Sequence, residues 1–269
     1  MDKFIPNFKI ETPTLITKRS ILSTVSKIWD PIGIFSPVIL QLQLLLQSLW
    51  QLHVSWDDEL PNSINKTFLE ALKEVEELRE YRLGRALVPP SITNADTLEL
   101  HGFCDGGESA YGAVVWLRYQ TEQTFRLTFL SSKTYIAPIK KCSVPRLELM
   151  SAVILIRLVA VVKTMVKVAK ITLWTDSATV LHWLHTPVSN FKPFVSTRIQ
   201  EILEVLPTAS ECFRYIKSSL NPADVLTKPK KNLNFLCGTE VRVFCNIQTL
   251  IGLANYPQKL IVQKLPSSN

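Results

Sequence analysis

Apolar residues recur every three or four positions in three segments of the first third of the chain, 20–28, 36–53 and 62–78. This spacing places them on one face of a helix, so each segment is predicted to be an α-helix. Ser36 is predicted to cap the second helix, with Pro37 in its first turn. Asn62 or Ser63 is predicted to cap the third. The chain therefore begins with a helical region.

The hydrophobic pattern changes after residues 88–96, a stretch rich in turn-forming residues. Three short apolar runs follow at 98–104, 112–119 and 124–131, and polar turn residues separate them. Runs of this length and spacing predict consecutive β-strands in an antiparallel meander.

Beyond the meander, helical and strand patterns alternate. A long apolar helix is predicted at 147–168. The later predicted segments are a strand at 170–176, helices at 177–185 and 193–206, a strand at 212–217, and a short helix from 221. The order β-β-β-α-β-α-α-β-α predicts an α/β fold with a mixed sheet and helices packed against it.

The same patterns divide the chain into three parts. Residues 1–95 are predicted to be a small helical region, and residues 96–230 are predicted to be a domain built on the mixed sheet. Residues 231–269 are basic at first and then apolar without a clear period, so they are predicted to be an irregular tail.

Charge and composition indicate the partners and the cellular compartment of the protein. A net charge of +7 favours a polyanionic partner. Five cysteines without CxxC pairs suit a reducing compartment, and we expect an intracellular protein that is not secreted. Residues 31–56 carry no Asp, Glu, Lys or Arg, but Gln43, Gln47 and Gln51 form a polar stripe. This segment is therefore predicted to be an amphipathic helix that does not cross a membrane.

Four acidic residues stand at the ends of predicted elements. Asp105 ends the first strand of the meander, and Glu148 lies in the first turn of the long helix. Asp176 ends the fourth strand, and Asp224 opens the last helix. Each has an ordinary structural explanation as a turn residue, a helix cap or a partner of the helix dipole.

Together these four acids suggest one shared site in addition to their local structural roles. If the first and fourth strands are parallel neighbours, Asp105 and Asp176 meet at one edge of the sheet, where Glu148 and Asp224 can join them. Gathered carboxylates repel one another unless a cation lies between them, and oxygen ligands without His or Cys suit Mg²⁺ or Mn²⁺. Two such ions would support phosphodiester hydrolysis.

Residues near these acids are candidates for contact with nucleic acid. Small residues after the first acid would let a nucleic-acid backbone come close, and basic side chains before Glu148 suit phosphate contacts. A solvated loop explains the basic residues equally well, and Ser177 can also be a helix cap. The candidates are Gly106, Gly107, Lys133, Lys140, Lys141, Arg146 and Ser177.

Four stretches of the sequence resemble the ribonuclease H domain of Bel/Pao-type LTR retrotransposon polyproteins. They are "FCDGGESAYGAVVW", "SSKTYIAPIKKCSVPRLELMSAVILIRL", "WTDSATVLHWL" and "NPADVLTK". The preceding stretch, from "TKRSILSTVSKIWDPIGIF" onward, is similar to the thumb and connection segment that follows the reverse-transcriptase palm. The resemblance covers residues 17–228, and the chain is expected to be part of such a polyprotein.

The resemblance implies a ribonuclease-H-like fold and metal-dependent cleavage of the RNA strand of RNA–DNA hybrids. It also implies that Asp105, Glu148, Asp176 and Asp224 bind two Mg²⁺ or Mn²⁺ ions. The expected partners are the hybrid and the rest of a reverse-transcriptase polyprotein.

The sequence departs from the family pattern at one site position, where Tyr215 stands in place of an expected His. A domesticated module that binds nucleic acid or protein without cleavage is therefore the alternative. A weaker alternative is another two-metal nuclease of the same fold. Integrase-like enzymes place their last acid late, whereas the helix acid of "RLEL" lies early in this domain.

Overall fold

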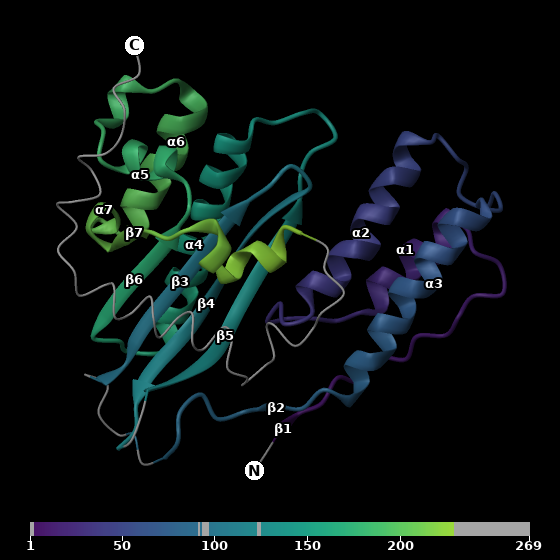
Figure 1. The fold of residues 1–269 in the computed structure, drawn as a ribbon, viewed down its shortest axis with the longest axis horizontal. Helices are drawn as coiled ribbons and strands as arrows, with labels where there is room; N and C mark the ends of the chain where they lie inside the picture. Colours follow the sequence, from purple (N-terminus) through teal and green to yellow (C-terminus); the bar gives the residue numbers. More distant parts are fainter. Residues whose placement is uncertain (1–2, 91, 93–96, 123–124, 229–269) are drawn as a thin grey trace.

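The computed structural model describes residues 3–228, except residues 91, 93–96 and 123–124. Figure 1 shows a bundle of three helices, α1 to α3, on one side of the molecule and a strongly twisted sheet with its own helices on the other. The last described segment runs between these two parts. The mixed α/β architecture predicted from the sequence is confirmed.

The helical region contains α1 (Lys18–Lys27), α2 (Ser36–Gln51), α3 (Asn62–Glu77) and the 3₁₀ helix η1 (Leu78–Glu80). Two short strands, β1 (Lys3–Phe4) and β2 (Leu83–Gly84), pair antiparallel at the two ends of this region. The three predicted helices are therefore confirmed, whereas the sequence pattern did not predict the short strand pair.

The predicted caps of α2 and α3 are wrong. Ser36 is already helical, and the carboxylate of Asp30 instead accepts hydrogen bonds from the backbone N–H groups of Ile34 and Phe35, at 3.0 and 2.7 Å. Pro61 precedes α3 without a side-chain cap. Asp30 can act from outside the helix because the turn at Gly33 brings its carboxylate back toward the helix start.

The five-stranded sheet has the order β5-β4-β3-β6-β7. The antiparallel meander consists of β3 (Glu99–Gly106), β4 (Ala110–Gln120) and β5 (Phe125–Ile136). Strand β6 (Lys170–Thr175) pairs parallel with β3, and β7 (Phe213–Tyr215) pairs parallel with β6. The predicted meander and the predicted parallel pairing of the first and fourth strands are both confirmed.

The segments between and after the parallel strands are mostly helical. The α-helices are α4 (Val144–Met165), α5 (Ala178–Leu184), α6 (Pro193–Val205) and α7 (Ala209–Cys212), and the 3₁₀ helices are η3 (Val188–Asn190), η4 (Ser218–Leu220) and η5 (Pro222–Leu226). Two details differ from prediction. The long helix begins three residues earlier than predicted, at Val144, with Pro145 in its first turn, so the prediction that Glu148 lies in the first turn is wrong. The last predicted helix is a 3₁₀ turn within the described residues.

Each face of the sheet is covered by its own buried cluster. On one face, apolar residues of α4 such as Leu149 and Leu155 pack against Cys104 and Val115. On the other face, Phe103 and Trp116 belong to a cluster that also contains the apolar sides of α1, α2 and α3. The helical region thus contributes to the core on one face of the sheet.

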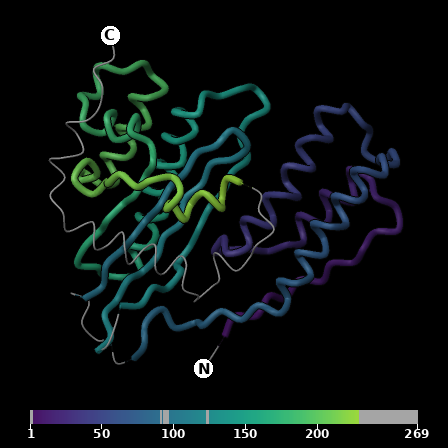
Figure 2. The backbone as a smooth tube through the Cα atoms, in the orientation of Figure 1, coloured from purple at the N-terminus to yellow at the C-terminus, as the bar shows by residue number. Residues whose placement is uncertain are grey.

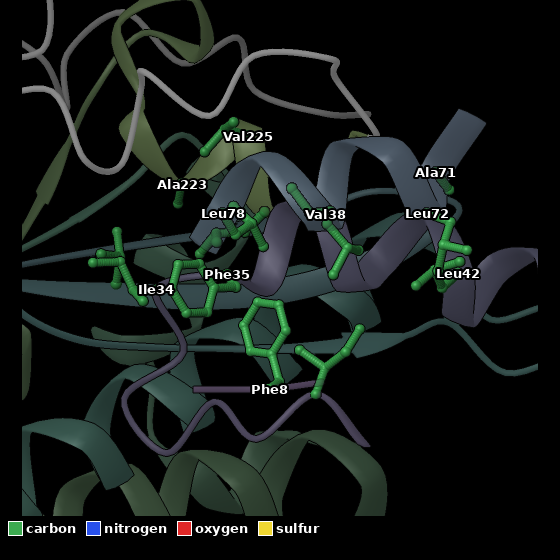
Figure 3. Close-up of a cluster of buried hydrophobic side chains, with 14 of the residues drawn as sticks. Phe8, Ile34, Phe35, Val38, Leu42, Ala71, Leu72, Leu78, Ala223 and Val225 are labelled. Carbon is green, nitrogen blue, oxygen red and sulfur yellow. The ribbon is translucent and has the colours of Figure 1, made fainter. Parts of the chain in front are cut away.

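Figure 3 shows this shared cluster, in which Phe35 and Val38 of the helical region lie near Ala223 and Val225 of η5. The two parts are also joined by backbone contacts, since Ser132 of β5 donates to the carbonyl oxygen of Ile32 at 2.8 Å. A Cβ on Gly33 would lie 1.9 Å from the carbonyl oxygen of Ser132, so only glycine fits there.

The predicted division of the chain remains a prediction. Residues 93–96, which contain the predicted boundary, and the tail at 231–269 lie outside the described residues. Within the described residues, Cys104, Cys142 and Cys212 are free thiols. In that same part of the chain, none of the helices combines the length and the hydropathy that a membrane crossing requires.

One partly buried charged group, Glu99 at the start of β3, is expected to make stability depend on pH. Glu99 Oε2 accepts from Arg118 Nη1 at 2.6 Å and lies 3.1 Å from His101 Nε2. Trp174 Nε1 donates to the other ring nitrogen of His101, so Nε2 carries the proton that Glu99 accepts. The hydrogen bond from His101, together with the hydrogen bond and the positive charge of Arg118, outweighs the effect of burial and lowers the pKa of Glu99 from 4.5 to about 2.

Because the folded-state pKa lies below the unfolded one, ionised Glu99 stabilises the fold above pH 4.5, and this contribution is lost as the pH falls through 2. Glu99→Gln is expected to lower the free energy of unfolding by about 2 kcal/mol at pH 7, after allowance for partial exposure. The loss should shrink steadily below pH 4. Urea unfolding at several pH values measures it, and a loss independent of pH would contradict the assignment.

Candidate active site

Asp105 and Asp176 lie at the same edge of the sheet because their strands are parallel neighbours. Cys104 of β3 pairs with Thr175 of β6, and each acid is the next residue along its chain. Asp105 is 8% exposed, whereas Asp176 is half-buried. The sequence-based expectation that these two acids meet is therefore confirmed by the register.

Glu148 reaches this edge from α4, whose start packs directly on the end of β3. A Cβ added to Gly106 would lie 2.4 Å from the backbone nitrogen of Glu148 and 2.5 Å from the carbonyl carbon of Leu147. Any side chain at position 106 would push the start of α4 away. The Ser177 hydroxyl then donates to Glu148 Oε2 at 2.5 Å and accepts from the backbone N–H of Val180.

Asp224 is held in the η5 turn, which is anchored on β3. Asn221 is the predicted N-cap, since its Oδ1 accepts from the Ala223 N–H at 3.1 Å, and Pro222 occupies the first position as expected. The Nδ2 of Asn221 donates to the carbonyl oxygen of Cys104 at 3.0 Å. The turn is thereby fixed beside the residue that precedes Asp105.

The helical region supports this turn from the outside. Figure 2 shows the end of the described chain crossing from the sheet toward α2. Val225 and Leu226 of η5 are buried in the same cluster as Val38 and Leu42 of α2. The position of Asp224 therefore depends on packing against both the sheet and the helical region.

The arrangement also includes Thr227 and Lys228, which were not among the predicted site residues. Thr227 donates its hydroxyl to Asp105 Oδ2, and the Lys228 ammonium forms an ion pair with Asp224. The spacing of Asp224 and Lys228 is a familiar signal for an ion pair within one helical turn. Nothing in the sequence pattern indicates that Thr227 would reach Asp105, because that contact joins distant segments.

The four carboxylates influence one another, and we refer to Asp105, Glu148, Asp176 and Asp224 as the acid cluster. The pKa of Asp105 is raised to about 6, mainly because the side chain is buried and also because Asp176 and Asp224 carry negative charge nearby. The pKa of Glu148 is raised by burial and by Asp176. The structure thus brings all four predicted acids into one region of shared negative potential.

The acid cluster matches a divalent cation by its donor chemistry. Carboxylate oxygens without His or Cys are the ligands that Mg²⁺ and Mn²⁺ prefer, and crowded negative charge attracts a cation. The Lys228 ammonium already serves as such a cation at Asp224. Within the described part of the chain, no three His, Cys, Asp or Glu side chains converge as they stand on a point where an ion would be held.

The predicted nucleic-acid contacts of the basic residues stay predictions. Lys133 is exposed on β5, and Lys140 and Lys141 are exposed in the following loop. Arg146 is exposed on the first turn of α4, where its guanidinium carbon lies 4.8 Å from the centre of the Phe194 ring. Tyr215, at the end of β7, is 38% exposed and pairs across from Thr175, close to Asp176.

The remaining candidates are Gly106, Gly107 and Ser177. The predicted helix-cap role of Ser177 is confirmed at the start of α5, whereas the contacts of Gly106 with α4 and of Ser177 with Glu148 were not predicted. Gly106 gives space to the backbone of α4, whereas a Cβ on Gly107 would meet its nearest atoms at 3.7 Å, an ordinary contact distance. Ser177 is 3% exposed and bonds to Glu148. Contact of these residues with nucleic acid remains a prediction.

The mixed sheet, with a three-stranded antiparallel meander extended by parallel strands, defines a ribonuclease-H-like domain. The chain belongs to the family described as "Pao retrotransposon-like RNaseH-like domain", which matches residues 17–177. The matched range includes most of the helical region and three of the four acids, and Asp224 lies beyond it. The family resemblance seen in the sequence is therefore confirmed, and the chain is a Pao/Bel-type retrotransposon polyprotein region.

Comparisons with solved structures return ribonuclease H and reverse-transcriptase chains at low identity. The N-terminal RNase H domain of rv2228c from Mycobacterium tuberculosis, solved as a fusion with maltose binding protein, is 16% identical, with a TM-score of 0.34. That match covers 57% of this chain and 99% of the other. The foamy viral protease-reverse transcriptase, in complex with RNA/DNA hybrid, is 13% identical, with a TM-score of 0.42. Here the match covers 78% of this chain and 26% of the other. No curated protein matches the chain.

Proposed function

We propose that the chain is a divalent-metal-dependent endonuclease that hydrolyses the RNA strand of RNA–DNA hybrids. The observation that carries the proposal is the meeting of Asp105 and Asp176 at the ends of two parallel strands, with α4 and η5 adding Glu148 and Asp224. If each acid had only a local role in a turn or at a helix end, the four segments would have no reason to place their acids at one edge of the sheet.

The acid cluster would hold two Mg²⁺ or Mn²⁺ ions, which supply activation of a water molecule and stabilisation of the leaving oxygen. The residues of the chain itself orient the carboxylates. Thr227 holds one oxygen of Asp105, and Ser177 holds one oxygen of Glu148. Both hydroxyls are buried, so they restrict the rotation of the carboxylates and reduce the reorganisation needed when substrate binds.

A nucleic-acid duplex is the proposed substrate because the chain carries a net charge of +7 and exposes basic side chains on β5, in the loop that follows and at the start of α4. Lys133, Lys140, Lys141 and Arg146 are exposed and are suited to contact phosphates. Duplexes with A-form character are recognised by shape and by contacts to 2′-hydroxyl groups, so we expect little dependence on base sequence. Membership in a ribonuclease-H-like family supports the RNA strand of a hybrid as the target.

The proposal is tested with the purified chain and a hybrid labelled on each strand in turn. In Mg²⁺ we expect internal cleavage of the RNA strand only, and no cleavage in EDTA. Duplexes of the same sequence made of DNA alone or RNA alone are the matched controls. Absence of RNA cleavage in both Mg²⁺ and Mn²⁺, or equal cleavage of the DNA duplex, would contradict the proposed activity.

A second candidate is a module that binds the hybrid without cleaving it. Two observations favour it: Tyr215 replaces the expected His beside Asp176, and Asp224 is already paired with Lys228. Fluorescence anisotropy with the same hybrid separates the two functions. Salt-dependent binding without cleavage would identify the binding module, whereas cleavage with turnover would identify the enzyme.

A further inference from the structure

The Lys228 ammonium lies at the outer side of the acid cluster. It forms an ion pair with Asp224, whose side chain is 16% exposed, while the Lys228 side chain is 58% exposed. The charges of Asp105 and Asp176 also act on this ammonium. One lysine therefore faces three of the four acids from the solvent side.

The preceding residue, Thr227, helps to hold Lys228 beside the acid cluster. Thr227 bonds to Asp105, and the next residue, Lys228, bonds to Asp224 four positions earlier. Thr227 is 2% exposed, and its hydroxyl oxygen lies 3.1 Å from the carbonyl oxygen of Asp224. The backbone N–H groups of Thr227 and Lys228 also donate to the carbonyl oxygen of Asp224, at 3.3 and 3.2 Å, so the start of the Lys228 side chain is held beside the carboxylates.

A divalent ion that binds Asp224 must break this ion pair and then lie near a positive charge. At distances of about 6 Å in a solvated site, one unit charge changes the affinity of a divalent ion by about tenfold. A rotated Lys228 side chain would remain tethered close to the same oxygen atoms. The lysine and the divalent ion therefore compete for one set of ligands.

We propose that Lys228 is a tethered competitor of the divalent ion at the Asp224 side of the acid cluster. This inference rests on the proposed function, since it concerns the metal ions of that site. Lys228 neutralises part of the negative charge in the metal-free protein and raises the metal concentration at which this side fills. Lys228 is thus a residue that sets metal affinity.

Binding of Mn²⁺ to the protein without nucleic acid provides the test, measured by electron paramagnetic resonance and by calorimetry. Lys228→Gln is expected to bind the weaker Mn²⁺ ion about tenfold more tightly than the unchanged protein. Lys228→Arg keeps the charge and is expected to bind Mn²⁺ as the unchanged protein does. Lys163→Gln is the matched control for net charge. Its helix position is about 22 Å along α4 from Glu148, well beyond the screening length of about 8 Å.

Thermal unfolding in EDTA supplies a readout that is independent of metal. Lys228→Gln leaves the carboxylates without their cation, so its melting temperature is expected to fall below that of Lys163→Gln and to rise more on addition of Mg²⁺. In an Asp224→Asn background, the effect of Lys228→Gln on Mn²⁺ affinity should largely disappear, because the two residues act as a pair.

The outcomes separate this inference from the proposed function. If the unchanged protein and Lys228→Gln bind Mn²⁺ with equal affinity, or if Lys228→Gln binds it more weakly, the competitor role is overturned while the nuclease proposal stands. If neither protein binds Mn²⁺, the competitor role is overturned, and hybrid cleavage then decides the proposed function by itself.

Discussion

Replacing Asp105 with Asn is expected to abolish cleavage of the RNA strand, with a fall in rate of about a thousandfold or more. Asp105 is the most buried member of the acid cluster and lies at the strand end nearest to Asp176. The amide has nearly the same shape but lacks the charge that a divalent ion requires. The rate is measured in single-turnover cleavage of a labelled hybrid.

Loss of activity in this variant should not reflect unfolding. The pKa of Asp105 is raised to about 6, so above that pH its ionised carboxylate destabilises the folded, metal-free protein relative to the unfolded chain. The melting temperature of Asp105→Asn in EDTA at pH 7.5 is therefore expected to equal or exceed that of the unchanged protein. Glu108→Gln, an exposed acid in the adjacent turn, is the control and should cleave within about twofold of normal. Full activity of Asp105→Asn would remove Asp105 from the site.

Gly106→Ala is expected to impair both stability and cleavage, although it adds a single methyl group. That methyl would lie 2.4 to 2.7 Å from three backbone atoms of Leu147 and Glu148, so α4 must move outward. Overpacking of this kind costs about 1–3 kcal/mol in the free energy of unfolding. A displacement of about 1 Å at Glu148 would lower the cleavage rate by about a hundredfold. Urea unfolding and single-turnover cleavage measure the two effects.

The adjacent Gly107→Ala is the matched control, because its methyl would meet its nearest neighbours at 3.7 Å. We expect its stability to change by less than about 0.5 kcal/mol. Hybrid affinity of the same variant tests the prediction that Gly107 gives clearance to a nucleic-acid backbone, since a bulkier residue should then weaken binding. Equal stability and activity of Gly106→Ala and Gly107→Ala would show that α4 does not press on the end of β3.

Local pattern was sufficient for most of the secondary structure. The predicted helices and strands of the described chain are present within a few residues, because each was indicated by its own apolar period and its own turn residues. Helix starts were less certain for a physical reason. Ser36 is a good cap by residue type, but the carboxylate of Asp30 reaches the free N–H groups first. Competition of this kind depends on the path of the preceding turn.

The candidate site shows the same division between local and long-range information. Parallel pairing of the first and fourth strands was inferred from element order, and the inferred meeting of Asp105 and Asp176 follows from it. The partners of the acids were not predictable, because Thr227 and Ser177 reach Asp105 and Glu148 across long stretches of sequence. Contacts between such distant segments produce no periodicity or spacing in the sequence.

By itself, the sequence determined the elements, the acids at their ends and the family resemblance, because these depend on neighbouring residues. Only the tertiary structure decided that the helical region shares its core with the sheet and with η5. Only the tertiary structure also placed Gly106 against the start of α4 and joined Thr227 to Asp105. These features arise from packing between distant segments, where the available space and the nearest charged partner select each contact.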